Sequence, residues 1–256
     1  MKKQIKNYLI RSLYKIKSPM WFQDRSHEGD LYDQYMKMHE ISLRTFNKHL
    51  KSEWEFIFFN KEVENIQEVF KDHFFEIYDI WKQGNVNILY CGPDNIMMKP
   101  TDIFGKYQDF RMFNYTDPKT SEEPNHYNFS KDLPTGLQHQ HFFNADVRYY
   151  PSTMSQDIWD MGLEMAENWD FNSWNTEQII LNKMLWDQEE RNIENTLDPK
   201  IAYQGHVLDL DDWEGTKAYS NHWNNCQIKD AHIVHLHGSR NAPKKLALMQ
   251  ELEKLS

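Results

Sequence analysis

The first half of the sequence alternates short apolar runs with longer segments in which apolar residues recur at helical intervals. Strands separated by helices build parallel sheets, because each helix carries the chain back to the same end of the sheet. The pattern predicts strands over residues 8–13, 53–59 and 87–91, and helices over residues 30–50 and 62–82. Gly84 follows the second helix, as glycine often does beyond a helix. We therefore expect an α/β fold with a mixed, mostly parallel central sheet flanked by helices.

The second half continues with the same two kinds of pattern. It predicts a strand over residues 141–149, helices over 155–167 and 176–189, a strand over 230–236 and a terminal helix over 243–255. Between the halves, residues 118–136 are rich in Pro, Asn, Glu and Ser with little periodicity, so we predict a long loop there. Because 256 residues is near the upper size of one compact domain, we expect a single domain over residues 1–256.

Charge and cysteine content exclude several classes of protein. The formal net charge of -10 would repel a phosphate backbone, and the basic residues do not cluster, so nucleic acid is not expected as a partner. An acidic protein that binds an anionic nucleotide needs local positive charge, which a bound metal ion supplies. Cys91 and Cys226 are far apart without metal-ligand spacing, which favours a reducing cytoplasm. No run approaches the roughly 18 apolar residues that span a bilayer.

The strand predicted over residues 87–91 runs directly into Gly92-Pro93-Asp94-Asn95, a cluster of turn formers. In open α/β sheets, ligands bind beyond the carboxyl ends of the strands. Asp94 is therefore a candidate ligand-binding carboxylate, held in place because apolar residues resume after Asn95. The alternative is that Asp94 and Asn95 only form an Asx-type turn.

A second candidate segment is AHIVHLHGSRNAPKK near the C-terminus. With the period of two of a strand, His235 and His237 project from one face. Gly238 follows, where the backbone can approach a ligand, so the segment suits a metal or phosphate site. Three basic residues then offer cationic partners for phosphate: Arg240, Lys244 and Lys245. The alternative is a solvated edge strand followed by a basic helix start.

The third candidate segment, NSWNTEQIILNKML, opens a predicted helix. Asn175 with Gln178 three residues later resembles a capping box. Glu177 in the first turn suits the positive end of the helix dipole. Both residues have a purely structural explanation, and this alternative stays open at the level of the sequence.

Together these segments resemble GT-A glycosyltransferases, particularly the retaining enzymes of the glycogenin and bacterial galactosyltransferase type. In that family a strand ends in an Asp-x-Asp motif. The segment ILYCGPDNIMMKP has that shape, with Asp94 on the second Asp and Gly92 where the first should be. The family's Asn-Ala-Gly motif is similar to FFNADVRYY, in which Asn144 and Ala145 are retained and Asp146 replaces the Gly.

Two further motifs of the family lie in the later half. Its Asp-Gln-Asp-x-x-Asn motif is similar to EQIILN, where Glu177 replaces the first Asp and Gln178 and Asn182 match. The metal-binding His of its His-x-x-Gly motif falls on His235, with Gly238 as its Gly. The Lys-Pro-Trp ending of the family is missing, and Pro243-Lys244 is its nearest remnant. The four partial matches occur in the family's order over roughly residues 53–245.

The resemblance implies transfer of a sugar from a nucleoside diphosphate, with UDP-glucose or UDP-galactose as donor, to a glycan, protein or small-molecule acceptor. It implies retention of anomeric configuration and a divalent metal, Mn²⁺ or Mg²⁺, on Asp94 and His235, with His237 as a further ligand. It places catalytic roles on Glu177, Gln178 and Asn144. The candidate residues for donor binding are Ser12, Tyr14, Gly92, Asn95, Gly238, Arg240 and Lys244.

Gly92 removes a carboxylate that the family uses for metal and donor, so two alternatives stay beside the enzyme. One is a non-catalytic or degenerate nucleotide-sugar-binding protein on the same fold. The other is a metal-dependent phosphohydrolase, although such sites usually need more clustered carboxylates than Asp94 provides.

Overall fold

The protein is described by a computed structural model that covers residues 4–17, 31–114, 143–168, 176–189, 197, 202–206, 230–237 and 242–256. Its main sheet has the strand order β3-β1-β5-β8-β7. The strands β3 (Glu55–Phe59), β1 (Lys6–Ser12) and β5 (Val86–Cys91) run parallel. The strands β8 (Phe143–Tyr150) and β7 (Arg111–Asn114) add two antiparallel pairings.

A smaller sheet has the order β6-β10-β9 and is built from β6 (Asn95–Met97), β10 (Ile233–His237) and β9 (Ala202–His206). A two-residue pair joins β2 (Lys15–Ile16) to β4 (Glu62–Val63). Only the turn at residues 92–94 separates β5 from β6, so the chain passes there from the main sheet to the smaller one. This crossing is the structural feature that positions the candidate site.

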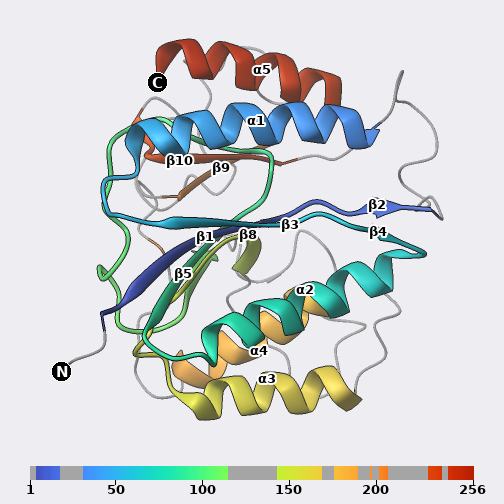
Figure 1. Cartoon of the computed structure of the whole chain (residues 1–256), viewed down its shortest axis with the longest axis vertical. Coiled ribbons are helices and arrows are strands. Elements are labelled where there is room, and N and C mark those ends of the chain that lie inside the picture. Colours follow the sequence, from blue (N-terminus) through green and yellow to red (C-terminus); the bar gives the residue numbers. More distant parts are fainter. Residues whose placement is uncertain are drawn as a thin grey trace, which may run out of the picture.

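Helices form a layer on each side of the main sheet (Figure 1). On one side, α2 (Ile66–Trp81), α3 (Gln156–Asn168) and α4 (Thr176–Glu189) bury a core that includes Phe74, Trp159 and Leu181. On the other side, α1 (Leu31–His49) and α5 (Ala242–Leu255) lie side by side over the smaller sheet. Their core includes Met38, Val234 and Met249.

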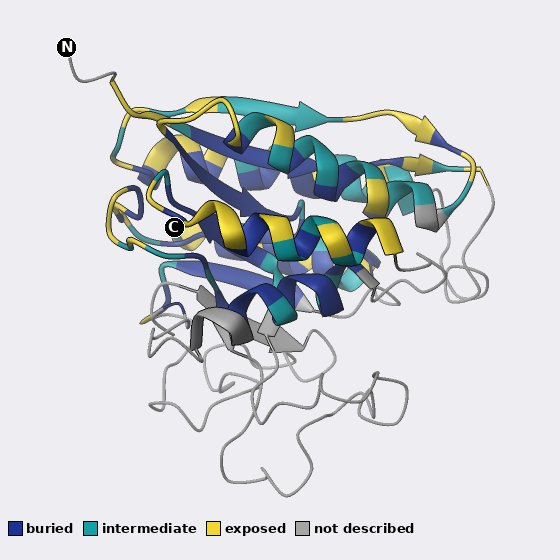
Figure 2. Cartoon of the chain, turned by 90° about the horizontal axis from the view of Figure 1, so that it is seen from below, coloured by how far each residue is buried: buried dark blue, intermediate teal, exposed yellow. Residues whose placement is uncertain are grey.

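The apolar face of each helix explains this layering. Buried residues of α1 recur at helical spacing, through Met38, Ile41 and Phe46, while the intervening residues include exposed Glu40 and Arg44. Burying such a stripe against a sheet removes apolar surface from water, which is the main favourable term in folding. Figure 2 shows the resulting pattern, with dark blue central strands between helices whose outer faces are yellow.

The predicted fold class is confirmed. Of the seven strand pairings in the described residues, four are parallel: β1 with β3, β1 with β5, β10 with β9, and β2 with β4. The helix predicted over 176–189 is α4 itself, and the helix predicted over 30–50 is α1 within one residue at each end. The strands predicted over 141–149 and 230–236 correspond to β8 and β10. The loop predicted over 118–136 lies outside the described residues.

The helix predicted over 62–82 begins four residues later than expected. Glu62 and Val63 pair with β2 instead, and Asn65 caps the helix by accepting a hydrogen bond from Glu68 N at 3.1 Å. The helix ends at Trp81, with Lys82 as its C-cap, and Gly84 follows in the turn beyond it with φ of 76°, a conformation that favours glycine. No helix in the described ranges is both long enough and apolar enough to cross a membrane.

Candidate metal centre

Two segments far apart in the sequence meet at the smaller sheet. Strand β6 pairs antiparallel with β10, and this pairing sets His235 opposite Asn95. One residue earlier, the carbonyl oxygen of Asp94 accepts a hydrogen bond from Leu236 N at 3.1 Å. Main-chain pairing therefore fixes the predicted ligands Asp94 and His235 beside each other.

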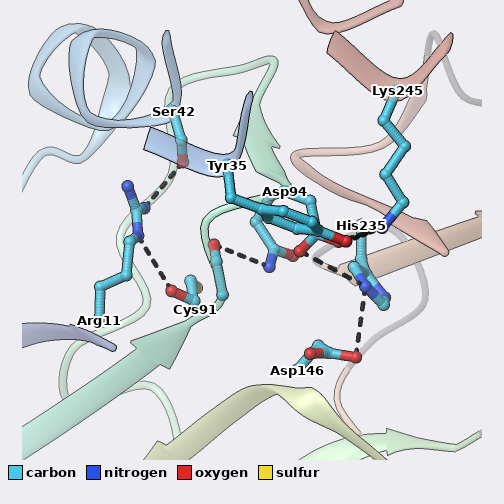
Figure 3. A network of polar contacts seen from close by, with 10 residues as sticks. Arg11, Tyr35, Ser42, Cys91, Asp94, Asp146, His235 and Lys245 are labelled. Atoms are coloured by element: carbon cyan, nitrogen blue, oxygen red, sulfur yellow. Dashed lines mark hydrogen bonds and ion pairs between the residues drawn. The ribbon is translucent and has the colours of Figure 1, made fainter. Parts of the chain in front are cut away.

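Three potential metal ligands converge at this point: Asp94, Asp146 and His235. One ligand atom of each lies within 4.8 Å of the others. His235 Nε2 is 3.8 Å from Asp94 Oδ1 and 3.3 Å from Asp146 Oδ2 (Figure 3). Nitrogen and oxygen ligands lie about 2.0–2.2 Å from a divalent transition metal. Two ligands of one cation are therefore at most about 4.4 Å apart, and both of these distances are shorter than that. Two carboxylates and an imidazole suit Mn²⁺ or a similar divalent metal.

Asp146 sits beside the glycine that interrupts the Asp-x-Asp pattern. Gly92 N donates a hydrogen bond to the carbonyl oxygen of Asp146 at 3.0 Å. A Cβ atom on Gly92 would lie 3.2 Å from Asp94 Oδ1 and 3.5 Å from Asp146 Oδ1. The Asp146 carboxylate, from the neighbouring strand, therefore lies beside the space that a side chain at position 92 would enter.

An irregularity in the sheet accompanies this placement. The register between β7 and β8 shifts between Met112, which pairs with Arg148, and Phe113, which pairs with Asn144. The three residues in between, Asp146 among them, form a bulge, and bulges often redirect side chains next to functional sites. In the sequence, Asp146 stands out only as the residue in the place of the Gly of the Asn-Ala-Gly motif. Two departures from the motifs point to Asp146: one motif has Gly92 where an Asp is expected, and the other has Asp146 where a Gly is expected.

The second oxygen of Asp94 is occupied by a lysine. Asp94 Oδ2 accepts a hydrogen bond from the Lys245 ammonium, which also donates to the Tyr35 hydroxyl at 3.2 Å. Burial alone would lower the pKa of Lys245, but the Asp94 carboxylate outweighs it and raises that pKa above its usual value. Burial likewise opposes ionisation of Asp94, yet Lys245 and His235 lower the pKa of that carboxyl. Both groups of this ion pair are charged.

Lys245 lies on α5 with its side chain almost fully buried, whereas the adjacent Lys244 is half-buried. The ammonium that reaches Asp94 is thus that of the second lysine, and Lys244 was the residue predicted for the donor. Which of two adjacent helical residues faces inward depends on how the helix packs, and α5 packs against α1.

Asn95 closes the turn before β6. Its Nδ2 donates to the carbonyl oxygen of Gly92 at 3.1 Å, and its backbone N donates to the same oxygen at 3.4 Å. Asn95 therefore makes the turn contacts that the sequence predicts. The Asp94 carboxylate instead points to His235 and Lys245. Asn95 Oδ1 is buried and accepts no hydrogen bond from the described residues. A buried acceptor of this kind beside two carboxylates fits a site that holds a cation.

A second polar cluster lies two residues along β8 from Asp146. Arg148 donates to Glu177 Oε1 at 2.7 Å and stands 4.1 Å from the ring centroid of Tyr90. His73 Nδ1 is 3.0 Å from the same carboxylate oxygen. Burial would raise the pKa of Glu177, but the Arg148 guanidinium dominates and lowers it to about 2. Glu177 is thus ionised, paired and only 5% exposed.

The other predicted residues are distributed around these clusters. Ser12 and Tyr14 are buried, and their hydroxyls contact Tyr90 OH at 3.1 Å and Glu76 Oε2 at 2.6 Å. Gln178 is half-buried in the first turn of α4. Asn144 belongs to β8 and His237 to β10. Gly238 and Arg240 lie outside the described residues.

No protein-family model and no curated protein matches this chain. Among solved structures, a glycosyltransferase involved in the glycosylation of the major capsid of PBCV-1 is similar, with a TM-score of 0.50 and 14% sequence identity. The match covers 96% of this chain and 99% of that one. At this identity the likeness shows a common fold and leaves the activity to the site itself. The chain therefore shares its fold with a glycosyltransferase and carries a candidate metal centre where its two sheets meet.

Proposed function

We propose that this protein is a metal-dependent glycosyltransferase that moves a sugar from a UDP-sugar, UDP-glucose or UDP-galactose, to a glycan, protein or small-molecule acceptor. The observation that carries the proposal is the convergence of Asp94, Asp146 and His235 just beyond the carboxyl end of β5. Ligand sites in open α/β sheets lie beyond such strand ends. The fold shared with a glycosyltransferase supports the same reaction class.

The residues present suit the chemistry of a diphosphate leaving group. A bound Mn²⁺ or Mg²⁺ would act as a Lewis acid toward the charge that develops on the diphosphate. Asp94 and His235 would hold it from the smaller sheet and Asp146 from β8. Lys245 adds a fixed positive charge on the opposite oxygen of Asp94. Gly92 leaves the space between the two carboxylates open.

The Arg148 pair suits the sugar side of the reaction. Asp146 and Arg148 are two residues apart on β8, which corresponds to about 7 Å along a strand. Arg148 in turn holds Glu177 through a hydrogen bond of 2.7 Å. Because its pKa is about 2, Glu177 has no proton to donate near neutral pH. In this proposal Glu177 acts as a fixed buried charge that orients Arg148 on the sugar side of the site, and not as an acid.

The remaining predicted residues keep their roles as proposals. Gln178 follows Glu177 directly and Asn144 lies two residues before Asp146, and both are assigned to the sugar. Ser12 and Tyr14, at the end of β1, are assigned to the base. Asn95, Gly238, Arg240 and Lys244 are assigned to the diphosphate, and His237 to the metal. Retention of configuration is part of the same proposal.

Isothermal titration calorimetry with UDP tests the proposal directly. UDP is expected to bind in the presence of Mn²⁺ and to lose this metal-dependent binding in Asp94→Ala and in His235→Ala. Unchanged affinity in both variants would reject the site. A panel of UDP-sugars with Mn²⁺ then tests turnover, because an enzyme releases UDP from one of them. A protein that only binds nucleotide sugars would bind UDP without releasing it from any donor, even with acceptors present.

A further inference from the structure

Asp94 uses its two oxygens for two different partners. Oδ1 faces His235 Nε2 at 3.8 Å, and Oδ2 accepts a hydrogen bond from Lys245 (Figure 3). Lys245 is 2% exposed and also donates to the Tyr35 hydroxyl. A buried ammonium is therefore built into the candidate metal centre, on the far side of one of its ligands.

The charge count of the site follows from these contacts. Asp94 and Asp146 contribute two negative charges and Lys245 one positive charge, while an imidazole that binds metal is neutral. Counted over these described side chains, the site offers one net negative charge to a divalent cation, and the buried Arg11 guanidinium near Asp94 adds positive charge beside it. A cation alone would therefore leave these groups with net positive charge. Since Asp94 is buried, water screens that charge poorly.

We propose that Lys245 makes binding of the divalent cation depend on binding of the diphosphate. This inference rests on the proposed function and adds to it a coupling between metal binding and nucleotide binding. The ammonium repels a cation that arrives alone, so metal affinity is low in the empty protein. A diphosphate supplies negative charge that attracts both the divalent metal and the Lys245 ammonium, so metal and nucleotide bind together. By linkage, each ligand then raises the affinity for the other by the same factor.

The test is Lys245→Met, which keeps the length of the buried side chain and removes its charge. Mn²⁺ binding is measured without nucleotide, by electron paramagnetic resonance of the free ion. The variant should bind Mn²⁺ alone at least about tenfold more tightly than the wild type, because Asp94 loses its competing cation. The factor by which Mn²⁺ raises UDP affinity, measured by calorimetry, should fall at least about tenfold. A Mn²⁺ affinity no tighter than that of the wild type would overturn the inference.

Two further variants control for side effects. Lys254→Met removes an exposed lysine from the last turn of the same helix and should leave Mn²⁺ affinity at the wild-type value. Lys245→Arg keeps the charge and should also bind Mn²⁺ alone weakly. If Lys245→Met does not fold, Lys245→Gln replaces it. Mn²⁺ should then raise the melting temperature of this neutral variant more than that of the wild type, and an equal rise contradicts the inference.

The outcomes separate this inference from the proposed function. If no variant binds UDP under any condition, the proposed function fails, while the Mn²⁺ affinities still decide the role of Lys245. If UDP binds with Mn²⁺ in the wild type and Lys245→Met leaves Mn²⁺ affinity unchanged, only the role of Lys245 fails.

Discussion

The two polar clusters on β8 differ in how completely their charges are paired. The Arg148 cluster, formed by Arg148, Glu177, His73 and Tyr90, is buried and balances one guanidinium against one carboxylate. The Asp94 cluster, formed by Asp94, Asp146, His235 and Lys245, has two carboxylates for one ammonium. Its Asp146 side chain is 41% exposed. Among the described residues, the Arg148 cluster is thus closed, with its carboxylate and guanidinium balanced, whereas the Asp94 cluster reaches solvent through Asp146 and has one more carboxylate than ammonium.

Removing one carboxylate from each cluster should separate them most clearly. Glu177→Ala leaves Arg148 as an unpaired buried charge and should lower the free energy of unfolding by about 3–5 kcal/mol. Asp146→Asn removes a carboxylate that solvent reaches and should lower it by less than about 1 kcal/mol. Urea unfolding measures both. Equal losses in the two variants would contradict the contrast between a closed and an open cluster.

Acid should destabilise the protein through the same closed pair. The pKa of Glu177 is about 2 in the folded protein and 4.5 as its reference value. A carboxyl with a lowered folded pKa stabilises above its unfolded pKa, and this stability is lost as the pH falls through the folded pKa. We expect a loss of about 3 kcal/mol between pH 4.5 and pH 2. Denaturant unfolding across this range should show a smaller loss in Glu177→Gln, and an identical pH profile would refute the assignment.

An exchange between Gly92 and Asp146 should test the open cluster. Asp146→Gly should reduce metal-dependent UDP affinity at least about tenfold, because one of the three candidate metal ligands is lost. Adding Gly92→Asp then restores a carboxylate near the same place. A Cβ atom at position 92 would lie 3.5 Å from the position that Asp146 Oδ1 has in the wild type. The double variant should regain most of the affinity by calorimetry. Gly92→Asp alone, which adds a third carboxylate, serves as the comparison, and a double variant no better than Asp146→Gly would argue against the exchange.

An exposed ion pair should have the smallest effect. Arg44 on α1 donates to Glu253 on α5 at 2.7 Å, and the Arg44 side chain is largely exposed. Arg44→Ala should therefore lower the free energy of unfolding by less than about 1 kcal/mol. The measurement is again urea unfolding. A loss as large as that of Glu177→Ala would mean that the loss of stability on removing one partner of an ion pair depends on the pairing itself and not on its burial.

The elements with strong periodicity were predictable, and the short ones were not. Helix α1, with apolar residues at helical spacing, and strand β5, with a continuous apolar run, carry clear patterns, so their limits follow from the sequence. Strands β6, β7 and β9 have the sequences NIM, RMFN and AYQGH, in which no more than two apolar residues follow one another, so their pattern does not indicate a strand. They are strands because a partner strand is present, which is tertiary information.

The same distinction applies to the candidate site. Asp94 and His235 were predictable because each follows or occupies a recognisable strand. Asp146 was not, because its position depends on the bulge in β8 and on pairing with Gly92. The ion pair of Glu177 with Arg148 likewise requires α4 to pack against β8. Residue types and motifs thus indicate the strands that carry the site, while their pairing decides which side chains meet.

The passage of the chain from one sheet to the other has a mechanical consequence. Asp94 and His235 belong to the half of the molecule that contains β10, α1 and α5, and Asp146 belongs to the half that contains β8 and α4. An ion bound by all three residues would link these two halves. Amide protons of β10 would then exchange more slowly when the ion is bound. Those in the middle of α3, which lies far from the place where the two sheets meet, would keep their exchange rates.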